Sequence, residues 1–234
     1  MKILAIDHAT EFASTALWCD GELTGHEAPA ARDHGGALLA MAESLLAAAG
    51  LSLPTLDAIA FGRGPGAFTG LRLAASVTQG LAFATDLPVI PVSDLRALAQ
   101  QVLGTAPAPR RALACQDARM GEVYWAAYRR VEGHAHAETE EAVAAPATMV
   151  DIAQRWLGEA GAAGAGSGFA AYDELAAIGA RLAPLAPSMR PRAREIALLA
   201  AHEGLAAGVA PELALPVYLR NDVAAIPAAN MSAP

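Results

Sequence analysis

Along the first hundred residues, short apolar runs of strand length alternate with longer stretches that have helical spacing. The pattern predicts strands at residues 2–7, 12–19, 22–28, 56–62 and 88–93. It predicts helices at residues 34–49, 70–85 and 93–103, the last of them capped by Ser93. Asp20-Gly21 separates the second strand from the third, and this dipeptide between alternating segments is a strong hairpin signal.

Strands joined by hairpins and followed by alternating helices and strands predict a mixed sheet flanked by helices, an α/β arrangement. This order resembles the half-domain plan of the ribonuclease-H-like, actin/Hsp70-type (ASKHA) folds. The 234 residues are enough for two such lobes. Residues 104–111 (GTAPAPRR) form a proline-rich connector, so we place an N-terminal lobe at 1–104 and a second lobe at 105–234.

The second half of the chain has a weaker pattern. It predicts strands at residues 112–118 and 122–130, a short strand within the glycine-rich stretch 158–168, and helices at 148–157, 173–182 and 192–207. We expect a degenerate version of the first lobe, whose C-terminal segment packs back on that lobe. A polar tail that we expect to be disordered ends the chain.

Composition and charge narrow the range of functions. The net charge is -8, which argues against a chain that holds nucleic acid alone, because phosphate binding needs a basic surface. Cys19 and Cys115 form no CxxC motif and fit a reducing compartment. The N-terminal apolar stretch meets Asp7 and Glu11 at once, so it predicts neither a signal peptide nor a membrane span. We expect a soluble, cytoplasmic protein with no membrane contact.

Residues 62–72, GRGPGAFTGLR, form a glycine-rich loop that leads into a predicted helix. A Walker A loop requires Lys and then Ser or Thr after its last glycine, whereas Gly70 is followed by Leu71 and Arg72. The dinucleotide fingerprint also fails, because position 67 is not a glycine. Two interpretations stay open: a backbone anion site at a helix N-terminus, and a sharp strand-to-helix turn without a ligand.

Asp7 ends the first predicted strand, within the sequence IDHATE. In folds of this type an acid at that place can organise a magnesium ion, with Thr10 near a phosphate. An acid at a strand end is also an ordinary solvated residue, and His8 is a bulky neighbour for a phosphate pocket. Both interpretations stay open from these residues.

The histidines complete no metal motif. His34 is followed one turn later by Leu38, and HEGLA at residues 202–206 lacks the second histidine of a zinc motif. His134 and His136 lie in an acidic stretch that we expect to be a solvated loop. We therefore expect no catalytic residue, no metal site and no cofactor.

The helix predicted at 70–85 carries a stripe of small residues. The stripe consists of Ser76, Gly80 and Ala84, with the larger Leu73, Val77 and Leu81 beside it. Together with the helix at 34–49, this face could pack closely against the helices of a partner. The alternative is that both faces pack on the protein's own sheet.

Several segments in combination are similar to one known family. They are ILAIDHATE (3–11), GRGPGAFTGLR (62–72), QGLAFATDLPVIPVS (79–93), DARMGEVYWAAY (117–128) and PVYLRN (216–221). On these motifs the chain resembles the bacterial TsaB family (also called YeaZ), accessory proteins for making threonylcarbamoyladenosine in tRNA. The family's first motif is closer to IDTATE, so His8 in the position of Thr weakens any nucleotide role.

The resemblance implies two actin-like lobes and a non-catalytic scaffold subunit. It implies pairing with the related catalytic subunit TsaD, an ATPase partner TsaE, and a homodimer of the chain itself. The complex transfers a threonylcarbamoyl group from threonylcarbamoyl-adenylate to N6 of the adenosine beside the anticodon, in tRNAs that read codons beginning with A. The chain would meet tRNA only through this complex.

The resemblance also assigns candidate residues. A vestigial nucleotide or phosphate loop would comprise Asp7, Thr10, Arg63, Gly64, Gly66 and Thr69. The partner interface would comprise His34, Leu38, Met41, Leu45, Arg72, Leu73, Ser76, Val77, Gly80 and Ala84. Two rival classes are a glycoprotease-like peptidase, which lacks a nucleophile and a complete zinc motif here, and an ATP-binding, sugar-kinase-like phosphotransferase.

Overall fold

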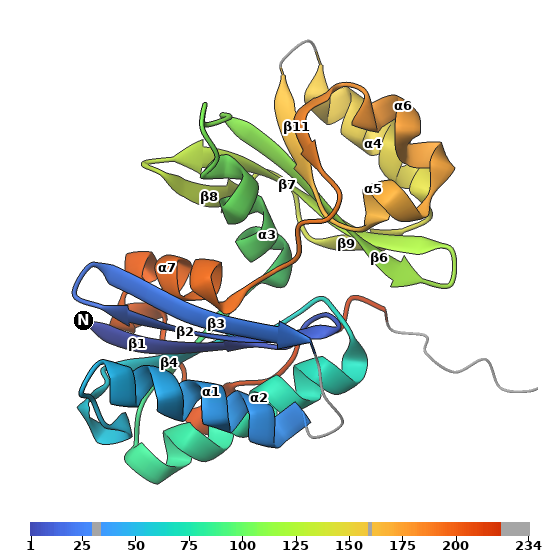
Figure 1. Cartoon of the computed structure of the whole chain (residues 1–234). Coiled ribbons are helices and arrows are strands. Elements are labelled where there is room, and N and C mark those ends of the chain that lie inside the picture. Colours follow the sequence, from blue (N-terminus) through green and yellow to red (C-terminus); the bar gives the residue numbers. More distant parts are fainter. Residues whose placement is uncertain (30–33, 159–160, 221–234) are drawn as a thin grey trace, which may run out of the picture.

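A computed structural model of the protein describes residues 1–29, 34–158 and 161–220. These residues form two mixed β-sheets, each flanked by helices (Figure 1). The tail that we expected to be disordered lies outside the described residues. Within them, no helix combines the length and the hydrophobicity needed to cross a membrane.

The first sheet has the strand order β3-β2-β1-β4-β5. Its strands are β1 (Lys2–Asp7), β2 (Phe12–Cys19), β3 (Glu22–Pro29), β4 (Ala58–Gly62) and β5 (Val89–Val92). β2 is antiparallel to β1 and β3, whereas β4 is parallel to β1 and β5. The predicted hairpin turn takes φ values of 49° at Asp20 and 102° at Gly21, a backbone conformation that Asp-Gly suits.

Helices cover both faces of the first sheet. α1 (His34–Ala48) and α2 (Phe68–Thr85) lie on one face, and α7 (Ala193–Glu203) lies on the other (Figure 1). Leu4 and Ile6 of β1 pack on the side of α1 and α2, while Ile3 and Ala5 pack against α7. A strand buried on both faces needs apolar residues at every position, which explains the continuous apolar run of β1.

The second sheet has the strand order β11-β10-β6-β7-β8, with β9 paired to β7. Its strands are β6 (Arg111–Arg119), β7 (Glu122–Val131), β8 (His134–Ala137), β9 (Ala142–Ala144), β10 (Ala162–Ala165) and β11 (Leu182–Ala186). The short helices α5 (Gly168–Ala171) and α6 (Ala176–Gly179) accompany α4 (Pro146–Leu157), which packs on the outer face.

Helix α3 (Asp94–Leu103) follows the first sheet in the sequence but packs against the second. Its Leu95 and Leu98 share a core with Tyr128 of β7. The Ser93 hydroxyl accepts a hydrogen bond from the N–H of Arg96 at 3.1 Å, so the predicted helix cap is confirmed. α3 and α7 therefore lie between the two sheets (Figure 1).

The helix predicted at residues 173–182 is only partly confirmed, over residues 173–179. The chain forms a 3₁₀ turn (Asp173–Leu175), the short α6 and then β11, which pairs in parallel with β10. Pro184, two residues beyond the predicted helix, has no N–H with which to continue a helix, whereas an edge strand such as β11 tolerates it. The helix predicted at 192–207 ends earlier than expected, at Glu203, because Gly204 takes a φ of 73°.

The acidic stretch that we expected to be a solvated loop, residues 132–141, contains strand β8, and β9 follows it directly. β8 and β9 both pair with β7. Ala135 of β8 is fully buried, and its N–H donates to Gln100 Oε1 of α3 at 2.7 Å. Contacts with β7 and α3 hold this stretch in place. These elements are distant in the sequence, so the local sequence pattern did not reveal the strand.

Candidate functional site

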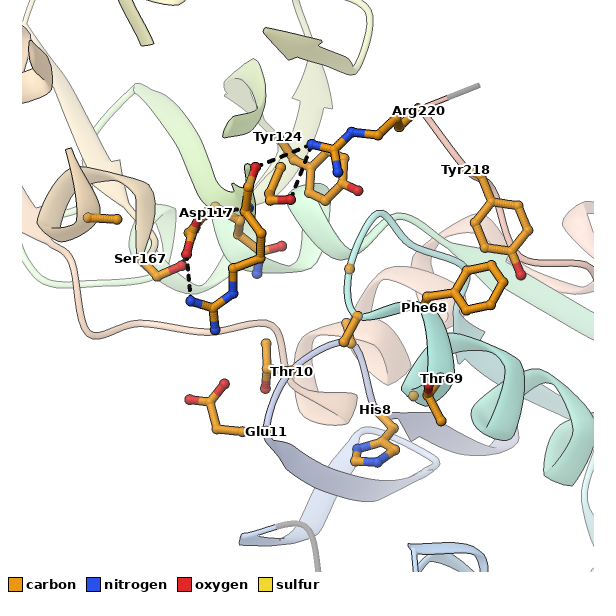
Figure 2. A pocket seen from close by; sticks show the side chains of 18 of the residues that line it. His8, Thr10, Glu11, Phe68, Thr69, Asp117, Tyr124, Ser167, Tyr218 and Arg220 are labelled. Carbon is orange, nitrogen blue, oxygen red and sulfur yellow. Dashed lines mark hydrogen bonds and ion pairs between the residues drawn. The ribbon is translucent and has the colours of Figure 1, made fainter. Parts of the chain in front are cut away.

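A cleft of about 910 Å³ lies between the two lobes. Its first-lobe wall consists of the turn after β1 and the start of α2, and its second-lobe wall includes the end of β6 and α5. The labelled lining residues in Figure 2 are His8, Thr10, Glu11, Phe68, Thr69, Asp117, Tyr124, Ser167, Tyr218 and Arg220. Both segments that the sequence analysis singled out, IDHATE and the glycine-rich loop, therefore reach one cleft.

The structure divides the residues assigned to a phosphate loop. Thr10, Gly66 and Thr69 line the cleft. Asp7 and Gly64 are buried and are not among its lining residues. The predicted set is thus not one constellation around a ligand.

Arg63, the remaining member of that set, faces a different groove. Its guanidinium forms an ion pair with Glu141 of the second lobe, with 3.2 Å between nitrogen and oxygen. Both side chains are largely buried, with exposed fractions of 26% and 14%. Arg63 therefore connects the two lobes in this structure.

Asp7 is buried against Asp94, the first residue of α3. Asp7 Oδ1 accepts a hydrogen bond from the N–H of Ala9 at 2.9 Å, and Asp94 Oδ2 accepts one from Gly64 at 2.5 Å. Burial raises the pKa of both carboxyl groups, and the charge of Asp7 raises the pKa of Asp94 further. A protonated Asp94 can donate to Asp7, which also gives the otherwise unpaired Asp94 Oδ1 a partner. This pair fastens the glycine-rich loop to β1 and α3.

The glycines of the loop allow close packing with the turn after β1. A Cβ on Gly66 would lie 2.6 Å from the carbonyl oxygen of Ala9, and one on Gly70 would overlap the carbonyl oxygen of His8. The N–H of Ala67 donates to Ala9 at 2.8 Å, so one of the loop's amides is already paired. Packing alone accounts for these glycines, which favours the sharp-turn interpretation over the anion site.

The second-lobe wall is built around Asp117, which the sequence analysis did not select. Its carboxylate accepts hydrogen bonds from the Tyr172 hydroxyl (2.8 Å) and the N–H of Arg119 (2.7 Å), and it forms an ion pair with the Arg119 guanidinium (3.0 Å). Its own N–H donates to Ser167 Oγ at 3.1 Å. The sequence signal that could have selected Asp117 is an acid near the end of an apolar strand, which occurs at Asp7 and again at Asp117.

The small-residue stripe of α2 lies on the surface. Ser76, Gly80 and Ala84 are exposed, and a Cβ on Gly80 would have no atom within 4 Å. The neighbouring Leu73 and Val77 are half-buried and pack on the core beneath α2. The stripe itself does not pack on the protein's own sheet, so another molecule can reach it.

On α1, two residues assigned to the partner interface belong instead to the core. Leu38 is 0% exposed and Leu45 is 3% exposed, because a helix lying on a sheet buries one stripe of its surface. Met41 is half-buried, and Leu39, which we did not assign, is 39% exposed. The side chain of His34 lies outside what the structure describes.

Exposed aromatic side chains lie at both ends of α2. Phe83 is 61% exposed near its C-terminal end, and Phe68 is 48% exposed at its N-terminal end. The guanidinium of Arg72 lies 3.9 Å from the ring centre of Phe68 and donates to the Tyr218 hydroxyl at 3.0 Å. Tyr218 belongs to the PVYLRN motif, so the C-terminal segment contributes to this surface.

The arrangement of two mixed sheets around a cleft defines a class: the chain is a two-lobed α/β protein of the actin/Hsp70 type. The TsaB protein of Escherichia coli (strain K12), a tRNA threonylcarbamoyladenosine biosynthesis protein, is 43% identical over 96% of this chain and 96% of its own. The TsaB protein of Haemophilus influenzae is 37% identical over 95% of each. The chain belongs to the TsaB (YeaZ) family.

Solved structures and a family model agree with this assignment. The structure of YeaZ from Pseudomonas aeruginosa is 40% identical and covers 93% of this chain and 99% of that chain, with a TM-score of 0.80. A family model for TsaD, tRNA N6-adenosine threonylcarbamoyltransferase, matches residues 28–228. The chain is therefore a relative of TsaD and acts in threonylcarbamoyladenosine biosynthesis.

Proposed function

We propose that this chain is a non-catalytic subunit that pairs with TsaD, with TsaE as ATPase partner. The complex would transfer the threonylcarbamoyl group from threonylcarbamoyl-adenylate to N6 of the adenosine beside the anticodon. Membership of the TsaB family and the match to the TsaD family model support this role. We propose that the two related chains pair through equivalent surfaces, as in the isologous interface of a two-fold dimer.

The exposed stripe of α2 carries the proposal. Small residues let two helices approach closely, and here Ser76, Gly80 and Ala84 present such a face to solvent. The exposed Phe83 beside the stripe supplies an aromatic side chain of the kind that anchors protein interfaces. We therefore propose α2, with the exposed residues of α1, as the surface that binds TsaD, and as the contact of a homodimer when TsaD is absent.

Two features in and beside the cleft support a subunit that does not perform chemistry. Asp7, which would have to organise a metal ion, is buried against Asp94. Asp117 on the opposite wall is engaged by Tyr172 and Arg119. We propose that the acids at the ends of β1 and β6 hold each lobe's loops in place.

The net charge of -8 supports contact with tRNA only through the complex. The charge at the tRNA-binding surface would then come from the partner chains. Because the substrate of the pathway is tRNA, we propose that the chain works in the cytoplasm.

The variant Gly80→Leu tests the proposed surface. Overpacking a close helix contact costs about 1–3 kcal/mol, so affinity for TsaD should fall by roughly five-fold to a hundred-fold. The free monomer, measured at a concentration too low for the homodimer, should keep or gain thermal stability, because nothing in the chain surrounds Gly80 and leucine favours a helix more than glycine does. Ala147→Leu, an exposed position on α4, is the matched control and should leave binding unchanged. Wild-type affinity in Gly80→Leu would refute the surface.

A further inference from the structure

Three histidines meet where the two lobes face each other. His134 and His136 are on β8 of the second sheet, and His202 is on α7, which packs against the first sheet. The rings of His134 and His202 are stacked, with centres 3.7 Å apart and planes 13° from parallel. His136 meets His202 edge-on, with 6.0 Å between ring centres. The sequence placed these histidines in a solvated loop and a failed zinc motif, so their contact is a feature of the tertiary structure.

Arg96 of α3 ties the elements around the cluster together. Its guanidinium donates to the carbonyl oxygen of Ala135, between the two histidines of β8, at 2.7 Å, and forms an ion pair with Glu203 of α7. Gln100, one turn further along α3, bonds to β8 through Ala135 and to the turn before it. The histidine contact is therefore part of a junction of α3, β8 and α7.

The charged groups around the cluster have both signs. Those that face the histidines or line the adjoining groove are Arg63, Arg96, Arg129, Glu132, Glu141 and Glu203. Each glutamate except Glu132 is paired with an arginine, Glu203 with Arg96 and Glu141 with Arg63. The pairing leaves little free negative charge to balance a histidine that gains a proton.

The stacked geometry favours neutral rings. Protonated histidine has two N–H donors, yet Nδ1 of His134 is buried and has no hydrogen-bond acceptor within the described residues. Burial lowers the pKa of His134, and the charges of His202 and Arg96 lower it further. Burial and then Arg96 likewise lower the pKa of His136. Two imidazolium ions at this separation would also repel each other.

We propose that His134, His136 and His202 form a proton-sensitive clamp that holds β8 of the second lobe against α7 on the first. With neutral rings the clamp is closed, and in mild acid it opens. The folded state disfavours the charged rings of His134 and His136, so the unfolded chain binds more protons near the ordinary histidine pKa of about 6.5. The stability that the clamp contributes is present above that pH and is lost as the pH falls.

The geometry does not suit a shared metal ion. The nitrogen lone pairs of nearly parallel, stacked rings lie in separate planes and do not converge on one point. No group of three or more metal-ligating side chains is found within the part of the chain that the structure describes. The cluster is therefore better suited to binding protons than to binding a metal ion.

Amide hydrogen exchange of the full chain, corrected for the intrinsic effect of pH, is the direct test. On lowering the pH from about 7.5 to about 5.5, the protection of β8 and of the end of α7 should fall at least several-fold more than that of β1 and β4. The His202→Gln variant removes the stacked ring and should lose this selective change. His26→Gln, an exposed histidine of β3, is the matched control and should behave as wild type.

A second measurement needs no variant of the cluster. The imidazole proton resonances of the wild-type chain, followed by NMR over the same pH range, should show two histidines that titrate below the ordinary value. Uniform exchange across both lobes, or the absence of two such histidines, would overturn the clamp. Stabilisation of the wild-type chain by Zn²⁺ that is lost in His202→Gln would also overturn it, in favour of a metal site.

Discussion

Asp7 and Asp94 face each other as a buried carboxyl pair, and Asp94 also accepts the N–H of Gly64 from the glycine-rich loop at 2.5 Å. Gly62 lies against the pair, since a Cβ there would be 2.7 Å from Asp7 Oδ1. The glycine-rich loop is thus held in place by its contacts with two buried carboxyl groups. We expect its conformation to depend on a proton held between the two carboxyl groups, because burial raises the pKa of both.

The first prediction concerns this proton. The raised pKa of Asp94 means that the folded state holds its proton more tightly than the unfolded chain does. Its contribution to stability is therefore complete below the ordinary aspartate pKa of about 3.9 and is lost as the pH rises through the folded-state pKa. Asp94→Asn keeps a neutral donor and an acceptor at every pH, so its melting temperature should exceed that of wild type at alkaline pH and approach it in acid.

Thermal unfolding of Asp94→Asn and Asp7→Asn across pH checks this assignment. Each kcal/mol of change in the free energy of unfolding should shift the melting temperature by about 2–4 °C in a chain of this size. Asp7→Asn should be destabilising, because it removes the charged acceptor of the pair. If Asp7→Asn were instead the variant with the higher melting temperature at alkaline pH, and Asp94→Asn the destabilised one, the proton would reside on Asp7.

The second prediction concerns the glycines of α2. Gly70→Ala places a Cβ against the carbonyl oxygen of His8, and neither backbone can move without disturbing β1. We expect a loss of at least about 2 kcal/mol in the free energy of unfolding, measured by urea denaturation. Gly80→Ala on the same helix should instead gain up to about 1 kcal/mol. Equal changes in the free energy of unfolding for Gly70→Ala and Gly80→Ala would mean that the backbone near His8 shifts to accommodate the methyl group.

The third prediction concerns the exposed aromatic residue beside the stripe. Phe83→Ser should weaken pairing with TsaD by roughly thirty-fold, the loss of about 2 kcal/mol that is typical of an interface anchor. The stability of the free chain should change little, because Phe83 is 61% exposed. Leu205→Ser, 47% exposed and close to the end of α7, is the control. Titration calorimetry on both variants separates a binding effect from a general effect of removing surface hydrophobic groups.

The fourth prediction concerns tRNA. With a net charge of -8, the isolated chain should give no shift of tRNA in a gel at physiological salt up to about 10 µM protein. Adding TsaD should produce a complex that contains both chains. A tight, salt-sensitive complex of tRNA with this chain alone would contradict the proposed division of roles.

The sequence by itself determined the elements whose signals are local. β1 and β4 are continuous apolar runs, the Asp20-Gly21 turn fixes a hairpin, and Ser93 caps α3. These features depend on side-chain periodicity and on backbone conformations that neighbouring residues set. The same segments carried the family resemblance, so the fold class and the pathway could be stated before the structure was known.

The tertiary structure decided which faces are covered and which polar groups meet. α2 is apolar or small nearly all round, so its sequence could not tell that Gly80 is exposed while Ala74 is buried. On α1 the periodic residue Leu38 faces the sheet, which removed it from the proposed interface. Asp94 contacts Asp7 only because α3 begins beside β1 and the glycine-rich loop. His134 contacts His202 only because α7 packs on the first sheet. Such contacts join residues far apart in the chain, and local periodicity carries no information about them.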